Sequence, residues 1–227
     1  MMSLFHFSPT GHLGRTVMLG IVLILLGGLP WTAIYADEPS ILEQYEEYVE
    51  PVSVDWGLPP SSVVEFFSYN CNICETVRNY VDHFLLHKPE SMLFVYYHVS
   101  AAENVAWQMS QVAFAAATLA GIEGNIHDEL FDRNALQGNL FLKPEDVRQY
   151  LAGVEGGQAA ADLVGSEEVA ALRAAISQKI KEAGVRQVPT FIVNQRYRVT
   201  WGSEMTVQEF TALLLAVAAL PPKDSSP

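Results

Sequence analysis

Apolar residues change their spacing within residues 62–86, and this change marks the most informative stretch of the chain. The first part is an apolar run interrupted only by Glu65, as expected for a short strand buried on both faces: Val63, Val64, Phe66 and Phe67. From Cys71 onward the apolar side chains recur at helical spacing, at positions 74, 77, 81, 84 and 85. The sequence therefore predicts a buried strand, a turn at residues 68–70 and an amphipathic helix that begins at Cys71.

A second strand-like run follows this helix, which we expect to end near Lys88 and Pro89. Residues 92–99 (MLFVYYHV) are rich in aromatic and β-branched side chains, and we expect them to form a second buried strand. Because a helix joins the two runs, the strands should be parallel. The resulting β-α-β unit places the cysteines at the C-terminal end of its first strand, where open α/β sheets carry their chemistry.

Residues 104–182 have a different pattern, rich in alanine and without a strand-like run. Apolar spacing predicts helices over 105–119, 126–131, 145–151 and 167–183. Gly121 and Gly124 mark the first break, and glycines 153, 156 and 157 mark a later one. Pro144 is placed to open its helix, and Ser166 is placed to cap the last of these helices.

Further strands are predicted after the helical segment and near the start of the chain. Residues 190–193 and 197–200 flank Asn194-Gln195-Arg196 as a hairpin, and a capping box of Thr206 and Glu209 opens a last helix to Leu220. Near the start, residues 41–48 are either a helical turn or the approach to a strand. Residues 48–54 alternate as a short strand, in which Pro51 favours an edge position. The predicted fold class is α/β.

The first 36 residues resemble an export signal rather than part of a domain. They contain no acidic residue and one arginine, and an apolar run of about 13 residues precedes Ala33-Ile34-Tyr35-Ala36. We expect cleavage after Ala36. The alternative is an uncleaved membrane anchor, for which the run is short, since a spanning helix needs about 17–25 residues. The mature chain would carry 12 basic and 26 acidic residues, a net charge of −14 that disfavours nucleic acid as a partner.

The chain has two cysteines, Cys71 and Cys74, in a Cys-x-x-Cys motif. At a helix N-terminus, free N–H groups and the helix dipole favour a thiolate, so Cys71 should be acidic and nucleophilic. Cys74 lies one turn further along, where it is placed to attack a mixed disulfide and release the partner. A bridge closing four residues stabilises a fold by only about 2 kcal/mol, so the pair is better suited to redox chemistry than to a structural role.

Metal binding is the alternative for these cysteines. The spacing Cys71-x2-Cys74-x8-His83-x3-His87 resembles a zinc-finger pattern, but Cys74 and His83 would be about 13 Å apart along the helix, too far to share a zinc ion. We expect His83 and His87 to be solvated helix residues. Two thiolates alone are able to hold Cu(I), although no Met-rich or His-rich tract supports this. We expect no bound metal and no cofactor beyond a redox-active Cys71–Cys74 disulfide.

The order β, β-α-β, helices, β-β-α around this motif resembles the thioredoxin superfamily, specifically the DsbA-like oxidoreductases. The residues that carry the resemblance are Val64 to Ser68, Cys71-Asn72-Ile73-Cys74, Tyr97-His98-Val99, Ala113 to Phe131, and Val188-Pro189-Thr190-Phe191-Ile192-Val193-Asn194. The resemblance implies a thioredoxin fold with an inserted all-helical domain. Its parts would be a signal peptide at 1–36, thioredoxin-like segments at 37–101 and 184–220, a helical domain at 102–183 and a disordered tail at 221–227.

The resemblance also implies roles for residues outside the motif. Pro189 would be a cis-proline facing the cysteines, which turns the backbone of Val188 toward an extended substrate strand. Glu65 would be a proton-transfer group beneath Cys74. Relatives often pair this acid with a lysine on the next strand, and Tyr96 stands at that position here. Without a cation Glu65 should have a raised pKa, unless it is an edge carboxylate that reaches solvent.

The implied activity is the transfer of disulfides to secreted proteins. We expect reduced, unfolded secreted polypeptides as substrates, a DsbB-like membrane partner that reoxidises the protein, a periplasmic location and a monomer. Strongly oxidising relatives carry Pro-His between the cysteines, and this chain carries Asn72-Ile73. Loss of the histidine should leave the Cys71 thiolate less stabilised, so isomerase or reductase activity is the alternative to oxidase activity.

Overall fold

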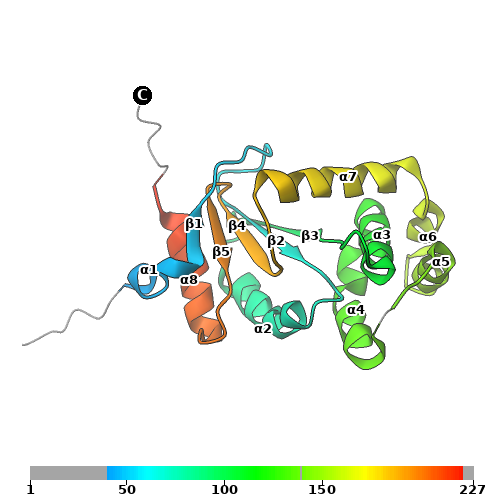
Figure 1. Ribbon diagram of the computed structural model, residues 1–227, viewed down its shortest axis with the longest axis horizontal. Helices are drawn as coiled ribbons and strands as arrows, with labels where there is room; N and C mark the ends of the chain where they lie inside the picture. Colours follow the sequence, from blue (N-terminus) through cyan, green and yellow to red (C-terminus); the bar gives the residue numbers. More distant parts are fainter. Residues whose placement is uncertain (1–39, 139, 222–227) are drawn as a thin grey trace, which may run out of the picture. The chain divides into compact units, whose positions relative to one another are not determined.

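The computed structural model describes residues 40–138 and 140–221, so the expected leader lies outside this part of the chain. Figure 1 shows the arrangement of its elements. The strands are β1 (Val49–Pro51), β2 (Ser62–Phe67), β3 (Leu93–His98), β4 (Thr190–Val193) and β5 (Tyr197–Thr200). The helices are α1 (Ile41–Gln44), the 3-10 turn η1 (Glu46–Tyr48), α2 (Asn72–His87), α3 (Val105–Ala120), α4 (Glu123–Gln137), α5 (Pro144–Ala152), α6 (Gln158–Leu163), α7 (Glu167–Glu182) and α8 (Val207–Ala219).

The five strands form one sheet in the order β1-β5-β4-β2-β3. β2 and β3 are parallel, as the helix between them predicts, and the other three pairs are antiparallel. β2 is buried along its whole length because it has a strand on either side and helices on both faces. Pro51 does lie in an edge strand, where its missing N–H leaves no gap in a central ladder.

β3 corrects one expectation, because it is not a buried strand. Within the described residues it pairs only with β2, so it forms an edge of the sheet, and most of its side chains are partly exposed. Leu93 is 37% exposed. Aromatic and β-branched content predicted the strand correctly, but this content does not determine how many neighbours a strand acquires.

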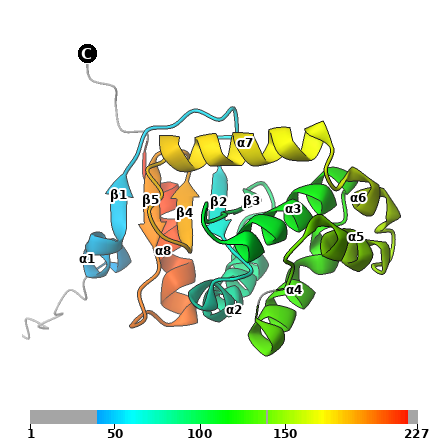
Figure 2. The ribbon, with the colours of Figure 1, turned by 45° about the vertical axis from the view of Figure 1, so that its right-hand side comes forward.

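Helices cover both faces of the sheet (Figures 1 and 2). On one face, Val63 packs with the apolar sides of α2 and α8, through residues such as Val77 and Phe210. On the other face, Val64 and Phe66 pack against the end of α7 around Ala183. This alternation along β2 directs Glu65 and Phe67 toward the side of α2, which is the side that carries the cysteines.

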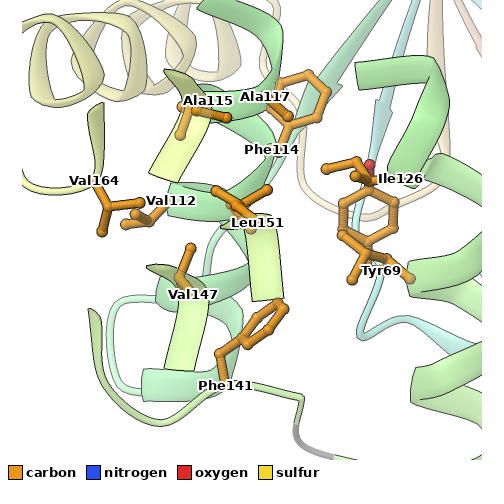
Figure 3. Packing of buried hydrophobic residues seen from close by; sticks show 14 of the residues in the cluster. Tyr69, Val112, Phe114, Ala115, Ala117, Ile126, Phe141, Val147, Leu151 and Val164 are labelled. Carbon is orange, nitrogen blue, oxygen red and sulfur yellow. The ribbon is translucent and has the colours of Figure 1, made fainter. Parts of the chain in front are cut away.

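Helices α3 to α7 form a second core beside the sheet. Figure 3 shows Phe114, Ile126 and Leu151 among the apolar side chains that fill it. The same cluster includes Phe67, Tyr69 and Cys74, so the helical segment packs directly against the end of β2 and the start of α2. This architecture matches the thioredoxin fold with an inserted helical domain that the resemblance implied.

Both boundaries of α4, and the presence of α6, differ from the sequence pattern. Gly121 ends α3 in the left-handed conformation (φ 72°), as a C-terminal glycine should, but Gly124 lies inside α4 rather than in a break. α4 continues to Gln137, six residues past the predicted end. α6 was not predicted, because its six residues, half of them alanine, are too few to show a helical period.

Candidate active site

Cys71 is the N-cap residue of α2, as the sequence predicted. Its backbone is extended (φ −103°, ψ 113°), and its Sγ accepts a hydrogen bond from the backbone N–H of Cys74 at 3.3 Å. The amide of Cys71 in turn donates to the carbonyl oxygen of Ser68 at 3.1 Å, which closes the turn after β2. The sulfur therefore sits where the free N–H groups of the first helical turn converge.

The pKa values of the two cysteines are shifted in opposite directions. Donation from the Cys74 thiol, with smaller contributions from the backbone N–H groups of Cys74 and Ile73, outweighs partial burial and lowers the pKa of Cys71 to about 6. Burial raises the pKa of Cys74 far above that of an ordinary thiol, and the charge on Cys71 raises it further. Both thiols are unpaired, Cys71 is partly exposed, and Cys74 is 1% exposed. This asymmetry suits an outer nucleophile and an inner resolving thiol.

The loop before β4 brings the backbone of Val188 beside Cys71. The Val188–Pro189 peptide bond is cis, as the resemblance implied. The carbonyl oxygen of Val188 lies 3.6 Å from Cys71 Sγ, and the thiol donates to it. The hydroxyl of Thr190 donates to the carbonyl oxygen of Gln187 at 2.8 Å and fixes the loop from its other end.

A cleft of about 340 Å³ opens next to Cys71. Its lining comes from three separate parts of the chain, namely the start of α2, the segment from the end of β3 to the first turn of α3, and the loop from α7 to β4. It includes Cys71, Val99, Trp107, Val185, Arg186 and Val188. Sequence analysis did not single out Trp107, Val185 or Arg186 for this cleft, because no motif contains them. A cleft of this kind is able to hold an extended peptide with its sulfur near Cys71.

Glu65 lies in the middle of β2 and is buried, with 4% of its surface exposed. Burial, with smaller contributions from the charges on Asp82, Cys71 and Glu123, raises its pKa to about 8. No salt bridge in the described part of the chain involves this carboxyl group. The expectation of a raised pKa therefore holds, and the alternative of an edge carboxylate in solvent does not.

Helix α4 contributes polar groups near Glu65 that the sequence did not indicate. Tyr96 pairs with Glu65 in the β2–β3 register, and its ring lies against that of His127, with 4.4 Å between centroids. Nδ1 of His127 lies 2.9 Å from Glu123 Oε1 and 3.4 Å from the hydroxyl of Tyr69. The inserted helices thus supply part of the surroundings of the buried acid.

Comparison with known proteins decides the family. The family model described as Thioredoxin matches residues 59–215. The chain belongs to this thioredoxin family. Among curated relatives, the thiol:disulfide interchange protein DsbA of Azotobacter vinelandii is 28% identical over 82% of this chain and 86% of its own length. The DsbA of Pseudomonas aeruginosa is 25% identical over 80% of this chain and 85% of its own length.

The solved structures agree with the fold. A crystal structure of a P. aeruginosa DsbA variant superposes with a TM-score of 0.67 at 21% identity, and covers 77% of this chain and 95% of that one. Together, the family match and the DsbA relatives identify a DsbA-like thiol:disulfide oxidoreductase.

Within this DsbA-like site, the two residues between the cysteines point outward. Asn72 is exposed, and the side chain of Ile73 is 52% exposed. Neither side chain donates a hydrogen bond to Cys71 Sγ. The donor to this sulfur is the backbone N–H of Cys74. The thiolate is therefore stabilised by the helix start rather than by the dipeptide side chains.

His83 and His87 lie far along α2 from the cysteines. His83 is partly buried and not simply solvated, because its Nδ1 lies 2.8 Å from the hydroxyl of Thr211 on α8. His87 is exposed and stacks on His83, with 4.0 Å between ring centroids. Within residues 40–138 and 140–221, no three His, Cys, Asp or Glu side chains are grouped as metal ligands.

A buried histidine supports the loop that leads to Cys71. The backbone N–H of Tyr69 donates to Nε2 of His98 at 3.1 Å, and the hydroxyl of Ser68 lies 3.4 Å from the same atom. Burial lowers the pKa of His98 to about 3, so the ring is neutral and accepts at Nε2. His98 thereby holds the turn between β2 and α2 in place.

Proposed function

We propose that this protein is an exported oxidase that donates its Cys71–Cys74 disulfide to reduced, unfolded polypeptides. The observation that carries the proposal is the position of Cys71 Sγ, which receives the Cys74 N–H at 3.3 Å and borders an open cleft. The contacts that lower the pKa of this thiol to about 6 stabilise the reduced protein. Stabilisation of the reduced form makes a dithiol–disulfide couple more oxidising.

The proposed reaction proceeds in two exchanges. A substrate thiolate attacks Cys71 Sγ, a substrate–Cys71 disulfide forms, and the Cys71–Cys74 bond breaks. Cys74 leaves as a thiolate and takes a proton, for which the carboxylic acid of Glu65 is the donor. A second substrate thiolate then attacks the substrate sulfur and releases the Cys71 thiolate. The substrate loses two electrons and the protein gains them.

Backbone groups of the Val188–Pro189 loop would hold the substrate during these steps. The Val188 carbonyl oxygen lies beside Cys71, where it is placed to accept a hydrogen bond from an extended substrate strand once Cys71 is in a disulfide. Asn72 and Ile73 would tune the couple by adding no charge or side-chain donor at Cys71, which leaves stabilisation of the thiolate to the helix start. The redox-active group is the cysteine pair itself, with no further cofactor.

The proposed location is the periplasm, with a cleaved leader. The relatives named DsbA and the apolar, acid-free start of the sequence support this location. Across the described residues, no helix has both the length and the apolar character that a bilayer crossing requires. A membrane protein of the DsbB type would take the two electrons and the protons from Cys71 and Cys74, and the protein would act as a monomer.

Trapping of mixed disulfides tests the proposed roles of the two cysteines. When the variants are mixed with polypeptides that carry a disulfide, Cys74→Ala should accumulate mixed disulfides, because the Cys71 thiolate opens the polypeptide disulfide and no resolving thiol remains to release the product, and Cys71→Ala should accumulate none. The double variant is the matched control. Equal trapping by the two single variants would refute the assignment of Cys71 as the nucleophile. The reduction potential of the wild-type couple against glutathione then separates an oxidase from a reductase or isomerase.

A further inference from the structure

The cleft beside Cys71 combines apolar walls with a single cationic side chain. Val99, Trp107, Val185 and Val188 supply apolar surface, and Arg186 is the one basic residue among the lining residues. Trp107 comes from the first turn of α3, so the helical insertion forms one wall. An extended segment in this cleft would meet an apolar surface and a positive charge within a few residues of its reacting cysteine.

The guanidinium of Arg186 is available to a ligand. Its residue is exposed, and in residues 40–138 and 140–221 its side chain makes no salt bridge or hydrogen bond. The charged residues nearest to it in the same segment and on β5 form hydrogen bonds with other groups. Glu182 accepts hydrogen bonds from Trp56 and Gln178, and Arg198 donates to the carbonyl oxygens of residues 183 and 184.

The position of Arg186 couples its charge to the reaction. Arg186 precedes Val188 by two residues, and the carbonyl oxygen of Val188 lies 3.6 Å from Cys71 Sγ. A substrate strand that pairs with the Val188 backbone would therefore run past Arg186. A carboxylate on that strand, one to three residues from the cysteine, would come within reach of the guanidinium.

We propose that Arg186 is a specificity residue that favours cysteines flanked by an acidic and an apolar residue. This inference rests on the proposed oxidase function and adds a substrate class to it. The rest of the protein is strongly acidic, so without Arg186 the general field would favour basic segments. Arg186 reverses that preference locally at the cleft.

Peptides that differ only in charge test the proposal. Each peptide would contain two cysteines and a leucine beside the first one, with Glu, Gln or Lys at one further flanking position. The oxidised wild-type protein should oxidise the Glu peptide about two- to five-fold faster than the Lys peptide, the range for one exposed ion pair. Each rate is divided by the rate of the same peptide with hydroxyethyl disulfide, an uncharged disulfide, which removes the effect of the flanking charge on the peptide thiol.

Variants of Arg186 and a matched control complete the experiment. Arg186→Gln should abolish the preference for Glu, and Arg186→Glu should reverse it, whereas Arg196→Gln on the exposed β4–β5 turn should retain it. High salt should weaken the wild-type preference. Equal rate ratios in wild type and Arg186→Gln would overturn the inference while leaving the oxidase function intact. Failure of every peptide to react would instead refute the oxidase function.

Discussion

Glu65 on β2 and Tyr96 on β3 face each other in the parallel register, so a phenol stands beside the buried acid where relatives often carry a lysine. The neighbouring charges, from Asp82, Cys71 and Glu123, are all negative, and they add to the effect of burial on the pKa of Glu65. The acid is therefore held protonated at neutral pH, which is the form that donates a proton to a leaving thiolate.

Replacement of Glu65 by glutamine should change the pH dependence of both stability and exchange. The folded-state pKa of about 8 lies above the ordinary value of 4.5, so the wild type loses stability as pH rises through this interval. Glu65→Gln should lack this slope and be more stable than wild type at pH 9, by a few kcal/mol at most. It should also release Cys74 more slowly, because the amide has no proton to give.

Urea melts from pH 5 to pH 9 and rapid-mixing kinetics measure these two effects. Glu103→Gln, on the exposed loop after β3, is the control for loss of a carboxylate. Parallel stability profiles for wild type and Glu65→Gln would show that Glu65 is ionised in the folded protein, against the assignment made here.

The stability of the two redox forms should depend on pH through Cys71. Its folded-state pKa of about 6 lies below the ordinary value of 9, so thiolate contacts stabilise the reduced form above pH 9 and this contribution is lost as pH falls to 6. After screening of the partly exposed sulfur, the contribution should be about 1–2 kcal/mol. We expect the reduced form to be the more stable one, with a margin that grows as pH rises.

Denaturant melts of both forms at pH 5.5, 7 and 8.5 check this prediction. Cys71→Ser supplies a reference in which the thiolate contribution is absent. An oxidised form that is the more stable one at every pH would support a structural role for the disulfide.

Substitution of Ile73 by histidine should make the couple more oxidising. The Ile73 side chain is 52% exposed, so the exchange does not disturb the core. An imidazolium in the first turn of α2 would add to the stabilisation of the Cys71 thiolate, lower its pKa below about 6 and raise the reduction potential. Thiolate absorbance during a pH titration and equilibration with glutathione measure the two changes, which should move together.

A neutral substitution separates charge from shape in this test. Ile73→Gln has a similar length and should leave the pKa of Cys71 near the wild-type value. An unchanged pKa in Ile73→His would mean that the helix start alone sets the reactivity of Cys71, and that the dipeptide has no part in it.

Loss of His98 should destabilise the turn that carries Cys71. His98→Phe keeps an aromatic ring at this buried position but cannot accept the N–H of Tyr69, which should cost about 1–3 kcal/mol at neutral pH. The folded-state pKa of about 3 lies below the ordinary value of 6.5, so His98 stabilises the fold above pH 6.5 and this contribution is lost as pH falls toward 3. The deficit of the variant should therefore shrink in acid.

Urea melts of wild type and His98→Phe at acidic and neutral pH measure how this deficit changes with pH. His87→Phe, at an exposed position, is the control. A deficit that stays constant with pH would mean that the ring of His98 is not required to remain neutral in the folded protein.

Local sequence patterns predicted most helices and strands and the part of the site formed by β2 and the start of α2. The change of apolar period at Cys71 identified both β2 and the N-cap cysteine, because strand and helix periods are properties of neighbouring residues. The cis bond at Pro189 came from the resemblance, since composition and spacing carry no sign of it. The same is true of the role expected for Glu65, although its burial followed from the strand pattern.

The other half of the site depends on packing between distant segments. Trp107 and Arg186 reach the cleft because α3 and the loop before β4 meet beside α2, and His127 reaches Tyr96 because α4 packs against the end of β2. None of these residues lies in a motif. The exposure of β3 was missed for a related reason, since its position in the sheet is fixed by strand order rather than by its own residues.

The contact between Cys71 and Val188 joins residues 117 positions apart, with the whole helical insertion between them. A chain that emerges from its N-terminal end presents the cysteines long before the loop that borders them. Until residue 188 has emerged, Cys71 has no carbonyl neighbour from that loop and the cleft lacks one of its walls. The surface on which we propose that substrates dock is therefore completed only after the insertion has been synthesised, well after the thiols themselves.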